Sequence, residues 1–425
     1  MENTLNFLIE ISKLKKVPRT GWVWLKVKNP ETIAQHLFRV SIMNWFLAQG
    51  KRPKLNLKRI IQISLAHDLC EVYAGDMTPY WDLLPEDANK RKETLKRWIR
   101  LPKKIKEQRD RKKFAKEKKA LQKLVKNLAP RLKKEITDSW LEYEKMFTKE
   151  GRFVKQGDKI ETLLQALEYW GPAPDSPVLG WWEEIHDLVD DPILLGFLKK
   201  IEEKFYGKTI FFNHKKLSWE VEILLKIGKL KTMPKNGWVL RGVINPETIA
   251  EHSFLSAIAN WVLSQGRKLS IEKVLKMSLV YKICEVYAGD ATPYFGLLSS
   301  DCQKDNEILK RWPRFSKKEK ERRFFRDYRV EKKALERLTT KLPKALKEEI
   351  ISLWDECKRR LTPEGNFVSQ VHWLTSYLQA LQYFERDHKF PILAWAEQAK
   401  EILNDPKLLE LRDEMEERFL AKVNF

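Results

Sequence analysis

Four side chains in the first half of the sequence belong to the residue types that commonly bind divalent metal ions. They are His36, the adjacent pair His67 and Asp68, and Asp158. A single histidine on an apolar helix is more often a hydrogen-bonded core residue than a ligand, so the combination carries the argument. Glu71 follows one helical turn after the pair and would lie on the same face. We expect the first histidine on one helix, the pair on a second and Asp158 at the start of a later one, together forming a site for a hard or borderline cation.

The segments that must position these side chains have helical spacing. Apolar residues recur three or four positions apart within residues 33–46, 60–69 and 160–167, and no segment shows a convincing strand alternation. Asn29 is a candidate N-cap, with Pro30 at the first helical position. These patterns predict an all-α fold with short connections.

The sequence also contains an internal duplication with a period of about 215 residues. Residues 29–36 recur almost unchanged at 245–252, and the hexapeptide EVYAGD occurs identically in both halves. A period of this length indicates a duplicated domain and not a solenoid unit. We place the first domain at residues 1–210 and the second at 211–425, with the boundary within Gly207 to Lys216.

Three runs in the first domain carry a family resemblance: ETIAQH, SLAHDLCEVYAGDMTP and FVKQGDKIETLLQALEY. They resemble the HD-domain metal-dependent phosphohydrolases, and within them the 5′-deoxynucleotidase branch. The resemblance covers nearly all of the first domain and implies two tandem HD-domain helical bundles, one bound divalent metal ion and a nucleotide substrate. The residues that it implies are His36, His67, Asp68 and Asp158 for the metal, Glu71 and Asp76 for catalysis, and Arg19 and Trp22 for phosphate and nucleoside binding.

Such a site suits hydrolysis of a phosphomonoester, which resists hydroxide because both reactants are anionic. A divalent ion neutralises phosphate oxygens and lowers the pKa of a bound water, and Mn²⁺, Co²⁺, Fe²⁺, Zn²⁺ and Mg²⁺ are the candidates. We expect Glu71 either to orient the nucleophilic water or to protonate the leaving 5′ oxygen. Arg19 would clamp the phosphate as a planar fork.

The second copy has lost most of the predicted ligands. The residues equivalent to His67, Asp68, Asp158, Glu161 and Arg19 are Tyr281, Lys282, His372, Thr375 and Lys235, whereas His252, Glu285 and Asp290 are retained. The Lys282 ammonium would stand near the place of the metal and could neutralise Glu285 and Asp290. We expect a catalytically inactive second domain that pairs with the first as an internal pseudo-dimer.

The positive charge of the chain is concentrated in two insertions. The 425 residues have a formal net charge of +22. Residues 90–134 contain 21 basic and 4 acidic residues, and residues 304–347 contain 17 and 7, so the rest of the chain is slightly acidic. Charge runs are usually solvated helix surfaces, but these insertions could also bind nucleic acid, with Trp98, Trp312 and Phe315 available for stacking.

Two further features restrict the class of protein. The four cysteines, Cys70, Cys284, Cys302 and Cys357, form no CxxC pair, which argues against a structural zinc site or a disulfide framework and favours reduced thiols. We expect residues 1–16 to form an amphipathic helix and not a cleavable leader, and no stretch approaches eighteen uncharged apolar residues. We therefore expect a cytoplasmic protein without a membrane partner.

These patterns leave three functional alternatives. The leading one is a metal-dependent phosphohydrolase that converts a (deoxy)nucleoside 5′-monophosphate to nucleoside and phosphate. The second uses the same site on a nucleoside triphosphate or on nucleic acid held by the basic insertions. The third is a nucleotide- or nucleic-acid-binding protein without activity, which the intact ligand set of the first domain argues against. An internal pseudo-dimer and a dimer of tandem chains both fit the sequence.

Overall fold

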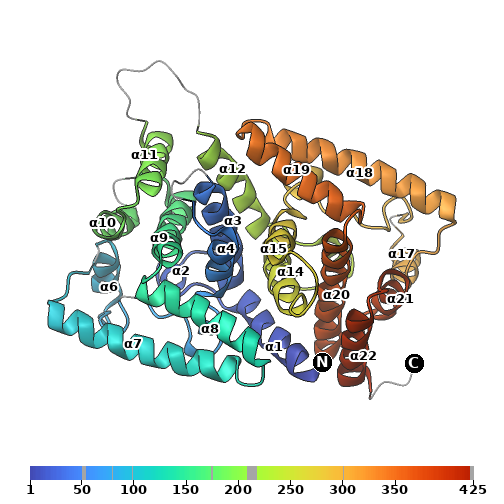
Figure 1. The fold of residues 1–425 in the computed structure, drawn as a ribbon, viewed down its shortest axis with the longest axis horizontal. Coiled ribbons are helices and arrows are strands. Elements are labelled where there is room, and N and C mark those ends of the chain that lie inside the picture. The colour runs from blue at the N-terminus through green and yellow to red at the C-terminus, as the bar shows by residue number, and fades with distance from the viewer. Residues whose placement is uncertain are drawn as a thin grey trace. The chain divides into compact units, whose positions relative to one another are not determined.

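The protein is helical throughout the part that the computed structural model describes, which comprises residues 1–49, 54–78, 80–97, 99–173, 176–207, 218–299 and 301–421 (Figure 1). In these ranges no strand is present, and two isolated β-bridges join Pro18 to Thr32 and Pro234 to Thr248. The expected all-α class is confirmed. None of the helices in these ranges has the length and apolar character needed to cross a membrane.

The chain forms two compact units, one of residues Glu10–Leu225 and one of Met1–Ile9 with Lys226–Phe425. Helices α1 (Glu2–Ser12) and α12 (Trp219–Gly228) therefore each contain a unit boundary. The domain boundary expected within Gly207 to Lys216 falls, apart from Gly207, on residues outside the described ranges.

The Glu10–Leu225 unit is built around α3, of which every residue is buried. Helices α4 and α9 pack on α3 and on each other, and α8 packs on both of them. The helices of this unit, after the 3₁₀ turn at Lys13–Lys16, are α2 (Thr20–Trp24), α3 (Ile33–Ala48), α4 (Leu57–Ala66), α5 (Glu71–Ala74), α6 (Ala88–Leu95), α7 (Lys103–Leu124), α8 (Pro130–Lys145), α9 (Lys149–Trp170), α10 (Val178–Leu188) and α11 (Pro192–Tyr206).

The second unit repeats this plan, as the duplication predicts. Its buried central helix α14 packs on α15 and α20, which correspond to α4 and α9. Its helices, after the 3₁₀ turn at Lys229–Lys231, are α13 (Asn236–Val239), α14 (Ile249–Leu263), α15 (Ile271–Val280), α16 (Glu285–Ala288), α17 (Cys302–Leu309), α18 (Lys317–Thr339), α19 (Lys344–Lys358), α20 (Pro363–Arg386), α21 (Leu393–Ile402) and α22 (Pro406–Leu420).

Local details of the expected helices were wrong in three places. The N-cap of α3 is Thr32 and not Asn29. The pair His67 and Asp68 follows the end of α4 in a turn before α5, so these residues do not share a continuous helix with Glu71. Asp158 lies in the middle of α9, which begins at Lys149.

Candidate metal centre and active site

The start of α3 positions both a candidate metal ligand, His36, and the segment that carries Arg19. The Thr32 hydroxyl accepts a hydrogen bond from the Gln35 amide, and the Gln35 side chain accepts one from the Thr32 amide, which completes a capping box. The backbone amide of Arg19 donates to the Glu31 carbonyl at 3.0 Å. The cap therefore places His36, one turn into the helix, beside the Arg19 segment.

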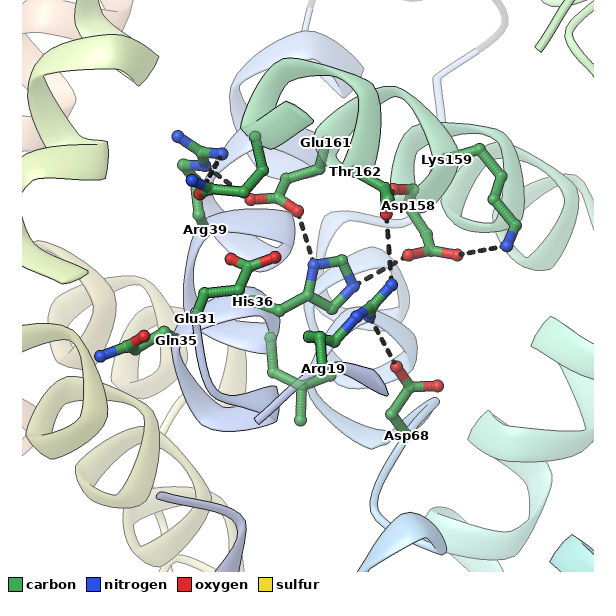
Figure 2. Close-up of polar contacts among 12 residues, drawn as sticks. Arg19, Glu31, Gln35, His36, Arg39, Asp68, Asp158, Lys159, Glu161 and Thr162 are labelled. Carbon is green, nitrogen blue, oxygen red and sulfur yellow. Dashed lines mark hydrogen bonds and ion pairs between the residues drawn. The ribbon is translucent and has the colours of Figure 1, made fainter. Parts of the chain in front are cut away.

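Three of the predicted ligands converge in the core of the unit. One donor atom each from His36, His67 and Asp158 lies within 4.8 Å of the others, and all three residues are buried. Figure 2 shows His36 pointing from α3 toward Asp158 on α9, and its Nε2 atom is 2.9 Å from Asp158 Oδ1. Gly157 permits this approach, because a Cβ atom there would lie 1.9 Å from the Asn44 side-chain oxygen on α3.

His67 presents an unused nitrogen to the same place. Its Nδ1 atom donates to the Ser64 carbonyl at 2.9 Å, which leaves the lone pair on Nε2. That Nε2 atom has no hydrogen-bond partner among the described residues, and the residue is only 1% exposed. It lies 3.3 Å from Asp68 Oδ2 and 3.8 Å from Asp158 Oδ1. A buried imidazole lone pair beside two carboxylates fits a divalent cation.

The charges around the cluster also suit a cation. Burial and Arg19 act to lower the pKa of His36, but Glu161 and Asp158 outweigh them and raise it to about 9. Burial acts to raise the pKa of Asp158, but Lys159 and His36 hold it well below its usual range. The position between these groups thus favours a positive charge. A second group of donor atoms, from Glu31, His36 and Glu161, shares the other nitrogen of His36.

The buried carboxylate of Glu161 orients His36, a role that the sequence analysis did not assign to this residue. Glu161 Oε2 lies 2.5 Å from His36 Nδ1, and Arg39 Nε donates to Glu161 Oε1 at 2.6 Å (Figure 2). This is the arrangement in which an outer carboxylate fixes the tautomer of a metal-binding histidine. Its signal in the sequence was the change of Glu161 to Thr375 in the second copy.

Replacing Glu161 by Gln should weaken metal binding by about 10- to 100-fold, because the His36 ring loses the carboxylate that orients it. Binding of Mn²⁺ measured by titration calorimetry would check this. Glu168→Gln is the matched control, because Glu168 also pairs with Arg39 but does not contact His36. Equal Mn²⁺ affinity in the two variants would contradict the assigned role.

Arg19 lies between Asp68 and Asp76, two carboxylates that the sequence analysis assigned to the site. Its Nη1 atom donates to Asp68 Oδ2 at 3.4 Å, and its Nε atom is 3.9 Å from Asp76 Oδ2. Asp76 also accepts a hydrogen bond from the Thr20 amide at 2.6 Å, and its carbonyl accepts one from the Thr20 hydroxyl at 2.9 Å. Asp76 therefore anchors the segment that presents Arg19.

Glu71 begins α5 and faces the same pocket. It is 5% exposed, and within the described ranges its Oε2 atom has no hydrogen-bond partner. Burial, together with the nearby carboxylates of Asp68 and Asp76, raises the pKa of Glu71 well above its usual range. An unengaged carboxyl group beside the metal ligands is available for proton transfer.

Trp22, the second residue predicted to bind substrate, is 1% exposed and packs within an aromatic cluster. Its ring centroid is 5.0 Å from that of Trp181 and 5.4 Å from that of Tyr169. Its indole N–H donates to Glu31 Oε1 at 2.9 Å. Trp22 and Trp181 both form part of the pocket wall.

A pocket of about 130 Å³ is lined by several of these site residues. Its lining includes Arg19, Asp68, Glu71, Asp76 and Asp158, together with three lysines that sequence reasoning missed, Lys113, Lys155 and Lys159. The first of these comes from the basic helix α7. The insertion therefore contributes directly to the pocket, a placement that depends on how α7 packs and has no local signal in the sequence.

The equivalent place in the second unit has a different polar network. Lys282 contacts Glu285 through a hydrogen bond and lies 3.4 Å from Asp290 Oδ1, as the sequence indicated. His252 Nε2 is 2.9 Å from His372 Nδ1. Among the described residues of this unit, no group of three donor residues suitable for a metal is found.

Comparison with known proteins places the chain in a family. A Xenopus laevis protein named 5′-deoxynucleotidase HDDC2 is 35% identical over 168 residues, which are 40% of this chain and 70% of the relative. The human protein of the same name is 34% identical over 39% of this chain and 67% of its own length. A Schizosaccharomyces pombe protein named 5′-deoxynucleotidase hdd1 is 28% identical over 48% of this chain and 92% of its own length. The family model described as HD domain matches residues 11–178 and 227–408, and since these two matches cover most of the sequence, the chain belongs to the HD domain family, in two tandem copies.

Proposed function

We propose that the protein is a metal-dependent phosphohydrolase that converts deoxynucleoside 5′-monophosphates to nucleoside and phosphate. The observation that carries the proposal is the buried convergence of His36, His67 and Asp158, with Arg19 and Asp158 lining one pocket. The relatives named 5′-deoxynucleotidase support the choice of substrate.

The residues of the pocket have distinct roles in this proposal. His36, His67, Asp68 and Asp158 would hold the cation, which when bound neutralises phosphate oxygens and lowers the pKa of a coordinated water. Arg19 binds two phosphate oxygens with its planar guanidinium. Glu71 orients the attacking water or protonates the leaving 5′ oxygen, and Asp76 holds the Arg19 segment in place.

A substrate panel tests this function. Phosphate release would be measured from deoxynucleoside and ribonucleoside monophosphates, from triphosphates and from a short single-stranded DNA, each with Mn²⁺, Co²⁺ or Mg²⁺. We expect metal-dependent release from the monophosphates. Release from triphosphates alone, or cleavage of DNA alone, would refute the monophosphate assignment.

We also propose that residues 1–210 form the active domain and that residues 211–425 form an inactive partner, paired with the first as an internal pseudo-dimer. The tandem family match and the altered second network support this proposal. A chain limited to residues 1–210 should then self-associate or aggregate, because it lacks the surface that would cover its apolar face. Sedimentation of residues 1–210 alone and of the full-length chain would test this. A short chain that stays monomeric without aggregating would contradict it.

Nucleic-acid binding by α7 is a second candidate function, favoured by one observation. Nine basic side chains of α7 are exposed, namely Lys103, Lys104, Lys106, Arg111, Lys112, Lys116, Lys118, Lys119 and Lys123. By contrast, several cations of α18 form ion pairs, including Arg322 and Arg323 with Glu319. Of the aromatic residues expected to stack on bases, Trp312 donates to Glu401, Phe315 lies under Arg323, and Trp98 lies outside the described residues.

The triple variant Lys104→Glu, Lys112→Glu and Lys119→Glu should therefore weaken binding to single-stranded DNA and flatten its salt dependence, because each lost phosphate contact lowers the slope of log affinity against log salt by about 1. Fluorescence anisotropy across a salt series would measure both effects. Matched reversals on α18, at Lys318, Arg322 and Lys332, provide the control. No binding by the wild type at low salt would end this candidate.

A further inference from the structure

The second unit retains a pocket of about 80 Å³ at the place equivalent to the metal-site pocket. Three cationic side chains, Lys235, Arg241 and Lys282, line it against a single carboxylate, Asp290. The pocket of the first unit is lined by four cationic side chains and five carboxylates. The balance of charge is thus reversed between the two copies.

The reversal follows from substitutions at equivalent positions. The carboxylates of Asp68, Asp158 and Glu184 in the first copy are replaced by the side chains of Lys282, His372 and Gln398. Arg241 takes the place of the apolar Leu25. These changes remove the groups that attract a metal ion and leave a pocket that attracts an anion.

Among the residues that the structure describes, two of the three cations form no ion pair with a carboxylate. Lys235 is 8% exposed, and its Nζ atom donates to the Ser376 hydroxyl at 2.9 Å but forms no ion pair within the described part of the chain. An ammonium group has three donors, so two remain unused in a buried position. Burial accordingly lowers the pKa of Lys235, an unfavourable situation that a bound anion would relieve.

Arg241 is in a similar situation. Its Nη atoms donate to the carbonyls of Gly237 and Leu309, and its guanidinium lies 4.3 Å from the Trp395 ring centroid. Its Nε atom is buried and has no hydrogen-bond partner among the described residues. Lys282, by contrast, is neutralised by Glu285 and Asp290, so the unbalanced positive charge belongs to the other two cations.

We propose that this pocket is a metal-independent binding site for a phosphate dianion, either free or as the phosphate of a nucleoside monophosphate, with Lys235 as its principal contact. A phosphate group offers several acceptor oxygens to the unused donors of Lys235 and Arg241. Trp238, Trp373 and Trp395 in the lining supply aromatic surface that suits a nucleobase. In this proposal the second copy binds an anion at the place where the first copy binds a catalytic cation.

Calorimetric titration of the full-length chain with inorganic phosphate, and separately with deoxyadenosine 5′-monophosphate, in excess EDTA would test the proposal. Lys235→Gln should weaken binding by about 10- to 100-fold, the contribution of a charge-assisted hydrogen bond. Arg19→Gln should leave it unchanged, which separates this site from the proposed catalytic one. Equal affinity for the two probes would assign the site to phosphate alone, and tighter binding of the nucleotide would assign it to the nucleotide.

Two controls keep the result interpretable. Lys276→Gln alters an equally buried lysine of the same unit that pairs with Glu272 and Glu349 outside the pocket, and it should bind like the wild type. Arg241→Leu restores the residue of the first copy and should also weaken binding if Lys235→Gln does not fold. The proposal is overturned if no binding occurs in EDTA, if Arg19→Gln abolishes it, or if Lys276→Gln weakens it as much as Lys235→Gln.

Discussion

Replacing Asp68 by alanine is expected to reduce metal-dependent phosphate release by more than about 100-fold, beyond the loss caused by an outer partner of a ligand. Asp68 Oδ2 is 3.3 Å from His67 Nε2 and 3.4 Å from Arg19 Nη1, so the variant loses a carboxylate from the cation site and leaves the Arg19 charge less balanced. Initial rates with saturating Mn²⁺, together with Mn²⁺ stoichiometry from calorimetry, would measure both consequences.

A pair of substitutions at equivalent positions provides the control. His67→Phe and Tyr281→Phe place the same residue at the same point of the two copies, in buried positions of similar packing. The first should abolish turnover and metal binding, and the second should preserve both. Comparable activity loss in the two variants would contradict a single active site in the first copy.

The candidate metal ligands could be proposed from the sequence because each lies in a local motif of a helical segment. Apolar spacing predicted the helices α3, α4 and α9. Helices that pack around one core bring the few polar residues on their buried faces close together. One detail that failed had a local signal that was overlooked. Asn29 and Thr32 are both acceptable N-caps, but only Thr32 is followed three residues later by a glutamine that completes a capping box.

The remaining parts of the site depend on the turn after α4 and on tertiary packing. The Nδ1 atom of His67 donates to the Ser64 carbonyl three residues earlier, which leaves Nε2 unused. Lys113 reaches the pocket because α7 packs on α5, although the two helices are far apart in the sequence. Neither contact has a periodicity or spacing that a sequence could display.

Comparison of the two copies shows how the residues around the buried histidine differ. His36 and its counterpart His252 are both buried, yet only the first has a carboxylate at the Glu161 position. In the second copy, Glu247 lies 3.5 Å from His252 Nδ1, and burial lowers the pKa of that histidine to about 4. With Glu247 as a neighbouring carboxylate but Thr375 at the Glu161 position, His252 is held neutral in the core, whereas the carboxylates around His36 favour its charged form.

Replacing Glu71 by glutamine should lower turnover by about 100- to 10,000-fold, the contribution of a positioned acid or base, while leaving metal affinity close to that of the wild type. Glutamine has the same shape but cannot transfer a proton, and Glu71 is not among the residues proposed to hold the metal. Turnover of a deoxynucleoside monophosphate and Mn²⁺ titration on the same preparation would separate the two effects.

Glu285→Gln is the matched variant, because Glu285 occupies the same position in the second copy and contacts Lys282. It should retain full turnover, since that carboxylate has no role at the first pocket. A chain in which Glu71→Gln keeps its activity would exclude Glu71 as the proton-transfer group and would leave Asp76, whose Oδ2 atom is 3.9 Å from Arg19 Nε, as the next carboxylate to test. Loss of Mn²⁺ binding in the same variant would instead make Glu71 a structural support of the ligands.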